Sequence, residues 1–114
     1  VLGAGQLAGM LAKAADKLNI EFTAIDGSGN SYINTIAHVK HINFQQSDQL
    51  LAELRAADYV TYETENLPID ALTPIQQDIR IEPSLEALRL FQDRLLEKNF
   101  LSSLGIPVVN YIGL

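Results

Sequence analysis

The sequence predicts a single α/β domain built on a parallel sheet, and three observations support this fold class. First, 47% of the 114 residues are hydrophobic, which is enough for one continuous core in a chain of this length. Second, the chain opens with a strand, a glycine turn and a helix. Third, strands and helices alternate afterwards, as they do in right-handed crossover units. Such sheets bind ligands at the carboxyl ends of their strands.

The predicted elements follow the chain in a regular order. Val1 and Leu2 end a buried strand, and the turn at residues 3–5 leads into a helix that stops near Asn19. The apolar residues of this helix recur at helical spacing: Leu7, Met10, Leu11, Ala14, Ala15 and Leu18. Further elements are strands at 22–26 and 39–42, a helix capped by Ser47, a strand at 58–63, a short helix between Pro68 and Pro74, and a strand at 79–81.

The carboxyl-terminal part is predicted to be a helix followed by an extended segment. Ser84 is placed to cap this helix, which breaks near Gln92 and stops before Gly105 and Pro107. Residues 108–114 are expected to be extended without a partner strand in this sequence. Because the chain also begins inside a strand pattern without an initiator Met, the natural protein is expected to continue at both ends.

Composition argues against several functional classes. Eight Lys and Arg against fourteen Asp and Glu give a net charge of −6, which repels the phosphate backbone of a nucleic acid. There is no Cys, so neither a disulfide scaffold nor a thiolate metal site can form. No apolar run approaches the ~20 residues that cross a bilayer, and the start lacks the pattern of a signal peptide. These features favour a soluble cytoplasmic protein with no nucleic-acid or membrane partner.

The first candidate site is the glycine turn. Gly3-x-Gly5-x-x-Ala8 at a strand-to-helix junction matches the relaxed dinucleotide fingerprint, and Asp26 stands where an acid that binds ribose would lie. Glycines at this place also allow a helix to pack on a strand, so ligand contact and a structural role both stay open. In either case the helix amino terminus offers unpaired N–H groups to an anion or polar ligand.

The second candidate site is the acidic segment at residues 61–66, at the carboxyl end of a predicted strand. If the strand persists, its period of two puts Glu63 and Glu65 on the same side. A substrate amine or ribose between them would relieve the repulsion of the two carboxylates. The alternative is a solvated acidic turn that caps the following helix.

The third candidate site lies on the carboxyl-terminal helix. Arg94 and Lys98 are four residues apart on one helical face, a spacing that suits a phosphate lying over both. The alternative is an exposed face on which Glu97 balances Arg94, and spacing alone favours this alternative. His38 and His41 lack a third ligand, so a metal site is not expected there.

Taken together, three blocks of sequence resemble the amino-terminal region of the 5-(carboxyamino)imidazole ribonucleotide synthase family of the ATP-grasp superfamily. The blocks are GAGQLAGM at 3–10, TYETENLP at 61–68 and QDRLLEK at 92–98. The resemblance spans nearly the whole chain. It implies an ATP-dependent ligase of purine biosynthesis that joins aminoimidazole ribonucleotide to bicarbonate through a carboxyphosphate intermediate, with magnesium.

The resemblance also implies an architecture and a set of site residues. Residues 1–83 would form a Rossmann-like pre-ATP-grasp domain with helices on both faces of its parallel sheet, and 84–114 would lead into an ATP-grasp domain outside this chain. Gln6, Leu7 and Glu63 would contact the ribonucleotide, and Arg94 would reach an ATP phosphate; the roles of Glu65 and Lys98 stay open. Magnesium ligands would lie in the later domain, so this segment would be inactive alone, and a homodimer is compatible with the family.

The sequence departs from the family pattern at a few places. Gly9 stands where an Arg is usual, Thr64 replaces a usual Phe, and residues 26–36 lack the usual Pro-Ala pattern. Two other functions stay open: the NAD(P)-binding domain of a dehydrogenase, which would use Gly3, Gly5, Ala8 and Asp26, and a stand-alone binding module. A dehydrogenase gives no reason for the acidic segment or the Gln-Asp-Arg block.

Overall fold

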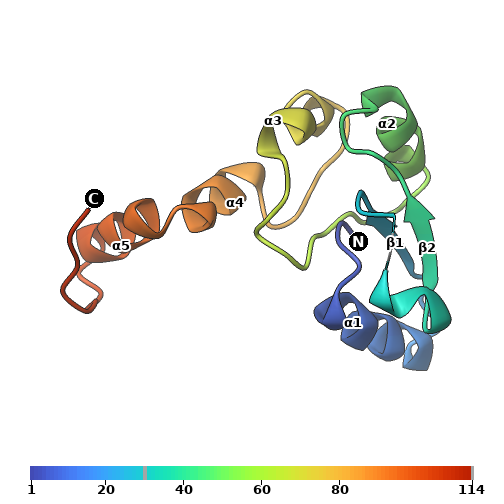
Figure 1. Ribbon diagram of the computed structural model, residues 1–114, viewed down its shortest axis with the longest axis horizontal. Coiled ribbons are helices and arrows are strands. Elements are labelled where there is room, and N and C mark those ends of the chain that lie inside the picture. Colours follow the sequence, from blue (N-terminus) through green and yellow to red (C-terminus); the bar gives the residue numbers. More distant parts are fainter. Residues whose placement is uncertain (30, 114) are drawn as a thin grey trace.

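The computed structural model describes residues 1–29 and 31–113 as an α/β fold (Figure 1). Its helices and strands are α1 (Gln6–Lys17), β1 (Thr23–Asp26), η1 (Tyr32–Thr35), β2 (His38–His41), α2 (Ser47–Arg55), α3 (Ile69–Leu72), η2 (Ile75–Gln77), α4 (Leu85–Gln92) and α5 (Arg94–Ser103). The predicted order of elements is therefore confirmed. The predicted helix stop is confirmed as well, because Asn19 takes a positive φ of 54° just after α1.

The sheet is parallel throughout its described pairings. Strands β1 and β2 pair from Thr23 opposite His38 to Asp26 opposite His41. On the other side of β1, Leu2 forms single parallel bridges with Ile25 and with Tyr62. The first predicted strand therefore lies in the middle of the sheet, between the second and the fourth.

The predicted strands at 58–63 and 79–81 are shorter in the structure than in the prediction. They appear as one isolated parallel bridge between Val60 and Ile81, in addition to the bridge at Tyr62. The resulting order across the sheet is β2, β1, Leu2, residues 60–62 and Ile81. This order reverses direction at the first strand, and such a reversal opens a crevice at the carboxyl ends of the strands.

Helices cover both faces of the sheet, as predicted. Neighbouring residues Ala24 and Ile25 of β1 belong to two different buried clusters, because successive side chains of a strand point to opposite faces. The larger cluster joins the sheet to α2, α3, η2 and α4, and the smaller cluster joins it to α1 and η1. In Figure 1, α1 and α2 lie on opposite sides of β1 and β2.

Helix α1 forms as predicted, but its large apolar residues do not face the sheet. The buried side of α1 consists of small residues: Ala8, Gly9, Ala12 and Ala15. Leu7 and Met10 are 55% and 62% exposed. A Cβ added at Gly9 would lie 2.9 Å from Cγ2 of Ile33, so a side chain there would require Ile33 of η1 to shift.

The caps of two helices differ in how well the sequence predicted them. Ser84 Oγ accepts a hydrogen bond of 3.2 Å from Ala87 N and caps α4 as predicted. Helix α2 begins at Ser47 itself, so the cap position falls on Gln46, whose side chain makes no capping bond. The expectation that Ser47 is the cap is therefore wrong by one residue.

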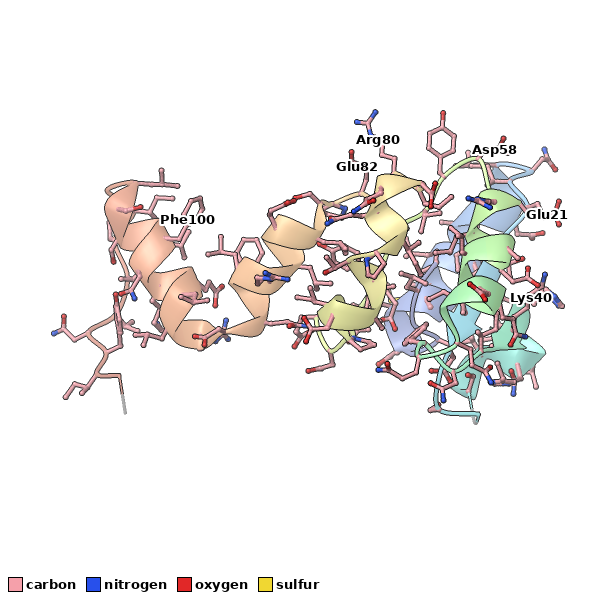
Figure 2. All side chains as sticks on the ribbon, turned by 90° about the horizontal axis from the view of Figure 1, so that it is seen from above. Glu21, Lys40, Asp58, Arg80, Glu82 and Phe100 are labelled. Atoms are coloured by element: carbon pink, nitrogen blue, oxygen red, sulfur yellow. The ribbon has the colours of Figure 1, made fainter. Side chains whose placement is uncertain are left out.

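The predicted break near Gln92 is confirmed at Asp93. The chain turns there from α4 into α5, and α5 extends away from the rest of the molecule as a helical arm (Figure 1). Phe100 on this arm lies far from Lys40 and Glu21 beside the sheet (Figure 2). None of the described residues of α5 is buried.

The segment after α5 folds back along the arm. Tyr111 Oη donates a hydrogen bond of 2.6 Å to Asn99 Oδ1, and Lys98 Nζ lies 5.5 Å from the centre of the Tyr111 ring. Residues 106–113 form no strand, and Leu114 lies outside the described residues. Among the described residues, no helix has the length and apolar character that a membrane span requires.

Candidate functional site

The glycine turn and Glu63 lie in direct contact at the carboxyl edge of the sheet. The backbone pairs the two segments, since Leu2 N donates to Thr61 O at 2.8 Å and Glu63 N donates to Leu2 O at 3.2 Å. The side chain of Glu63 then reaches across the turn, and its Oε1 accepts a hydrogen bond of 3.1 Å from Gly5 N. The carboxylate therefore receives one of the N–H groups at the start of α1.

This contact shows why the turn requires glycine at residue 3. Gly3 has a φ of 102°, a backbone conformation that side chains rarely adopt, and an added Cβ would lie 2.5 Å from Glu63 Oε1. The structural role of the glycines, which the sequence left open, is thus present. Their contact with a ligand stays a prediction.

A pocket of about 530 Å³ opens beside this contact. Its lining residues come from α1, from the acidic segment and from the loop before α4: Leu7, Met10, Leu11, Tyr62, Glu63, Thr64, Glu65 and Pro83. One wall is apolar and the other carries two carboxylates. Burial, together with the negative charge of Glu82, raises the pKa of Tyr62, so its hydroxyl keeps its proton at neutral pH. The pocket suits a ligand with a flat apolar face and hydrogen-bond donors.

The structure brings two of the four predicted site residues to the pocket and places a third, Gln6, beside the glycine turn. Leu7 and Glu63 line the pocket. Gln6 is the first residue of α1, next to Gly5, and its side chain is exposed. The first-turn N–H groups of a helix lack partners within the helix, so a polar ligand here meets both a carboxylate and amide donors.

Arg94 is not one of the residues that line this pocket. Its Nη1 donates a hydrogen bond of 2.5 Å to Glu97 Oε2 on the exposed face of α5. This bond, the charge of Glu97 and the more distant charge of Glu65 raise the pKa of Arg94. The predicted alternative, in which Glu97 balances Arg94, therefore describes this conformation. Lys98 turns toward Tyr111 instead.

Sequence reasoning assigned no role to Gln92, which makes two side-chain contacts near the pocket. Its Nε2 donates hydrogen bonds of 2.6 Å to the carbonyl oxygens of Glu65 and Leu67. Its position in the Gln-Asp-Arg block was the only signal in the sequence. Spacing could not reveal the contact, because 25 residues separate Gln92 from the nearer of its two partners.

Asp26, the predicted ribose-binding acid of a dehydrogenase, is occupied by its own loop. Ser28 Oγ and Ser31 Oγ donate hydrogen bonds of 2.5 and 2.6 Å to Asp26 Oδ2. Desolvation raises the pKa of Asp26, but these hydrogen bonds and the charge of His41 outweigh it and lower the pKa overall. Two hydroxyls of its own loop therefore occupy Oδ2 of Asp26 in this structure.

Metal-binding groups and a second pocket are the remaining features to compare with the first pocket. The described residues contain no group of three or more His, Asp or Glu side chains that could hold a metal ion. A second pocket of about 560 Å³ lies at the opposite end of the strands, with Leu18, Ile20 and Tyr59 in its lining. Parallel sheets bind ligands at the carboxyl ends of their strands, so the first pocket is the candidate site.

The arrangement of the sheet and helices is typical of one class of protein. A parallel sheet that reverses its order at a glycine turn, with helices on both faces, is the architecture of a nucleotide-binding α/β domain. The family model described as "Ribonucleotide synthetase preATP-grasp domain" matches residues 1–92, and the chain belongs to this family. The resemblance found in the sequence is thereby confirmed, and the dehydrogenase alternative is not favoured.

Curated relatives and solved structures agree with the family. N5-carboxyaminoimidazole ribonucleotide synthase from Brucella melitensis is 35% identical over 107 residues, which are 93% of this chain and 30% of that protein. The Staphylococcus aureus enzyme complexed with ADP is 31% identical with a TM-score of 0.86, covering 99% of this chain and 31% of that one.

One solved structure contains both nucleotides. It is the Aspergillus clavatus synthase in complex with ADP and 5-aminoimidazole ribonucleotide, which is 30% identical with a TM-score of 0.77. The match covers 96% of this chain and 30% of that chain. The chain thus spans about 30% of the length of each of these relatives.

Proposed function

We propose that this chain is the amino-terminal part of an enzyme that uses ATP to carboxylate aminoimidazole ribonucleotide with bicarbonate in purine biosynthesis. Residues 1–83 form its pre-ATP-grasp domain, and residues 84–114 lead toward the ATP-grasp domain. The Aspergillus clavatus relative, whose structure holds ADP and the ribonucleotide, supports this substrate. On this proposal the segment supplies part of the ribonucleotide site and is inactive by itself.

The observation that carries the proposal is the contact between Glu63 and the glycine turn beside the pocket. Glu63 Oε1 accepts a hydrogen bond from Gly5 N, and the Glu63 carboxylate also lines the pocket. There it accepts a hydrogen bond from the amine or a ribose hydroxyl of the ribonucleotide. Leu7 contributes the apolar wall, and Gln6 adds an exposed amide at the start of α1. A carboxylate that accepts a hydrogen bond from a backbone N–H is held in position before the ligand arrives.

Arg94 serves the ATP end of the same reaction. Its side chain is 81% exposed and bound to Glu97 alone among the described side chains, so it can turn from this carboxylate to an ATP phosphate. A guanidinium binds phosphate through two parallel N–H donors, which a lysine cannot reproduce. The exchange of one anionic partner for another keeps the charge of Arg94 compensated.

Magnesium and bicarbonate belong to the remainder of the enzyme on this proposal. The described residues offer no group of three or more His, Asp or Glu side chains that could hold a metal ion, and the magnesium ligands are expected in the ATP-grasp domain. No catalytic step is therefore assigned to a metal here. The assembly of two subunits also stays an expectation that comes from the family resemblance.

Glu63→Gln in the full-length protein tests the proposed ribonucleotide site. The amide keeps an oxygen that can accept the Gly5 N–H but loses the charge, so the fold should persist. Loss of a charged hydrogen bond raises the KM for the ribonucleotide by about 10- to 100-fold. The assay is phosphate release from ATP, which requires aminoimidazole ribonucleotide and bicarbonate. Hydride transfer to a nicotinamide, or an unchanged KM in Glu63→Gln, would contradict the assignment.

Arg94→Ala tests the ATP contact, with Arg89→Ala as its matched control. Both arginines are exposed, and they lie only five residues apart on either side of the break at Asp93. Removal of a guanidinium from a phosphate raises the KM for ATP by about tenfold or more, whereas the control leaves it unchanged. Equal ATP kinetics in the two variants would remove Arg94 from the site.

A further inference from the structure

The side chain of Gln92 joins two parts of the molecule that the proposed function uses separately. Gln92 is the last residue of α4, and its Nε2 lies 2.6 Å from the carbonyl oxygens of both Glu65 and Leu67. A primary amide nitrogen carries two N–H groups, so both are used here. We refer to residues 63–67 as the acidic loop and to these two hydrogen bonds as the Gln92 clamp.

The acidic loop is held at both of its ends. At the first end Glu63 is bonded to Gly5 N, and at the other end Leu67 is buried in the larger core cluster. Between them, Asn66 N donates a hydrogen bond of 3.2 Å to Thr64 Oγ1. Two carbonyl oxygens of the loop, those of Glu65 and Leu67, accept the hydrogen bonds of the Gln92 clamp.

The other side of the clamp is anchored as firmly. Leu88, one helical turn before Gln92, is 1% exposed and belongs to the same core cluster as Leu67. Asp93 follows Gln92 directly and caps α5, since its Oδ1 accepts from Leu95 N at 2.8 Å and from Leu96 N at 3.0 Å. Gln92 therefore sits where the direction of the arm, and with it the position of Arg94, is set.

We propose that Gln92 is a positioning residue, which holds the carboxylates of the acidic loop in a fixed relation to Arg94. Gln92 touches neither substrate; it acts through the carbonyl groups of Glu65 and Leu67. This inference rests on the proposed function, because it links the ribonucleotide end of the site to the ATP end. Only a side chain with two donors on one atom makes both bonds. Methionine at this position has a similar shape but no N–H donors. An ionised glutamate would place a negatively charged oxygen against the two carbonyl oxygens, which it would repel.

The clamp itself is tested by amide hydrogen exchange in the full-length protein, without reference to activity. Gln92→Met is compared with wild type and with Gln49→Met, which makes the same change at an exposed position of α2. Loss of two hydrogen bonds speeds exchange of residues 64–67 and of the first turn of α5 by about tenfold. The control leaves both segments unchanged. Unchanged exchange of the acidic loop in Gln92→Met would overturn the clamp.

The positioning role is tested by kinetics of the same variants. Gln92→Met raises the KM for the ribonucleotide and the KM for ATP together, by about tenfold each, and Gln92→Glu raises them further. A merely structural role would instead lower the amount of active enzyme, which reduces kcat and leaves both KM values alone. Faster exchange with unchanged KM values would overturn the positioning role.

The two proposals fail in different ways. A wild-type protein that cleaves no ATP in the presence of the ribonucleotide and bicarbonate would overturn the proposed function, and the exchange experiment would still decide whether the clamp exists. Normal wild-type activity with unchanged exchange in Gln92→Met would overturn the clamp and leave the proposed function standing.

Discussion

The carboxyl edge of the sheet and the helical arm carry the two halves of the proposed site in different ways. At the sheet edge, backbone pairing and the buried core hold Glu63 against the glycine turn. On the arm, none of the described residues of α5 is buried, and Glu97 is the one described side chain that holds Arg94. The side chain of Glu63 at the sheet edge is therefore held in place by the fold itself, whereas the position of the arm depends on its junction with α4. The two ends of the site should therefore respond differently to substitution.

The largest contrast is expected between two leucines on either side of the junction. Leu88 in α4 is 1% exposed and Leu96 in α5 is 47% exposed. Leu88→Ala leaves a cavity in the core and lowers the free energy of unfolding by about 2–5 kcal/mol, whereas Leu96→Ala changes it by about 0.5 kcal/mol. Urea unfolding followed by circular dichroism measures both. Similar losses would mean that α5 shares the core of the sheet.

A second contrast compares two glycines that both have a positive φ. An added Cβ at Gly3 meets Glu63 Oε1, whereas nothing lies within 4 Å of a Cβ added at Gly105 after the arm. Gly105→Ala bears the backbone penalty alone, about 1 kcal/mol. Gly3→Ala adds the displacement of Glu63, for a total of about 2–3 kcal/mol. Gly3→Ala should also raise the KM for the ribonucleotide, whereas Gly105→Ala should leave this KM unchanged.

Equal effects of the two glycine substitutions on unfolding would show that the Glu63 side chain yields without cost. In that case Glu63 would not be held in place before a ligand binds. The comparison therefore measures how far the sheet edge is preorganised, independently of any enzymatic assay.

The smallest contrast concerns the caps of the two helices. Ser84 caps α4, which is packed on the core, and Asp93 caps α5, which is not. Replacement of either by Ala removes about 1 kcal/mol of helix stability. For Ser84→Ala this loss lowers the midpoint of global unfolding. For Asp93→Ala it should appear only as faster hydrogen exchange within α5, since this helix can open locally. A clear drop in the global midpoint for Asp93→Ala would show that α5 unfolds together with the core.

The sequence predicted the elements that local signals define. Glycine at residues 3 and 5 marked the turn, Ser84 marked the start of α4, and the chain breaks after Gln92 as expected. The parallel order followed from the alternation of strands and helices. The position of the acidic segment beside the glycine turn followed from the rule that carboxyl ends of neighbouring strands meet, whereas Leu7 was named only through the family resemblance.

Features that depend on the distance between elements could not be predicted. Helical periodicity pointed to the leucines of α1, but the close approach of η1 and the sheet leaves room only for Ala8, Gly9, Ala12 and Ala15. The hydrogen bonds of Gln92 span 25 and 27 residues, and no spacing rule reports contacts of this range. The pairing of Arg94 with Glu97 was an alternative that the sequence offered, because side chains three residues apart are neighbours on one face of a helix.

The central claim is that Glu63 and the glycine turn form one preorganised part of the ribonucleotide site. The most direct measurement is a titration of the isotope-labelled full-length protein with aminoimidazole ribonucleotide, followed through the backbone amide resonances. The claim predicts the largest shifts at Gly5, Gln6, Leu7 and Glu63, with little change in α2. Shifts confined to other parts of the protein, with the Gly5 amide unmoved at saturation, would contradict it.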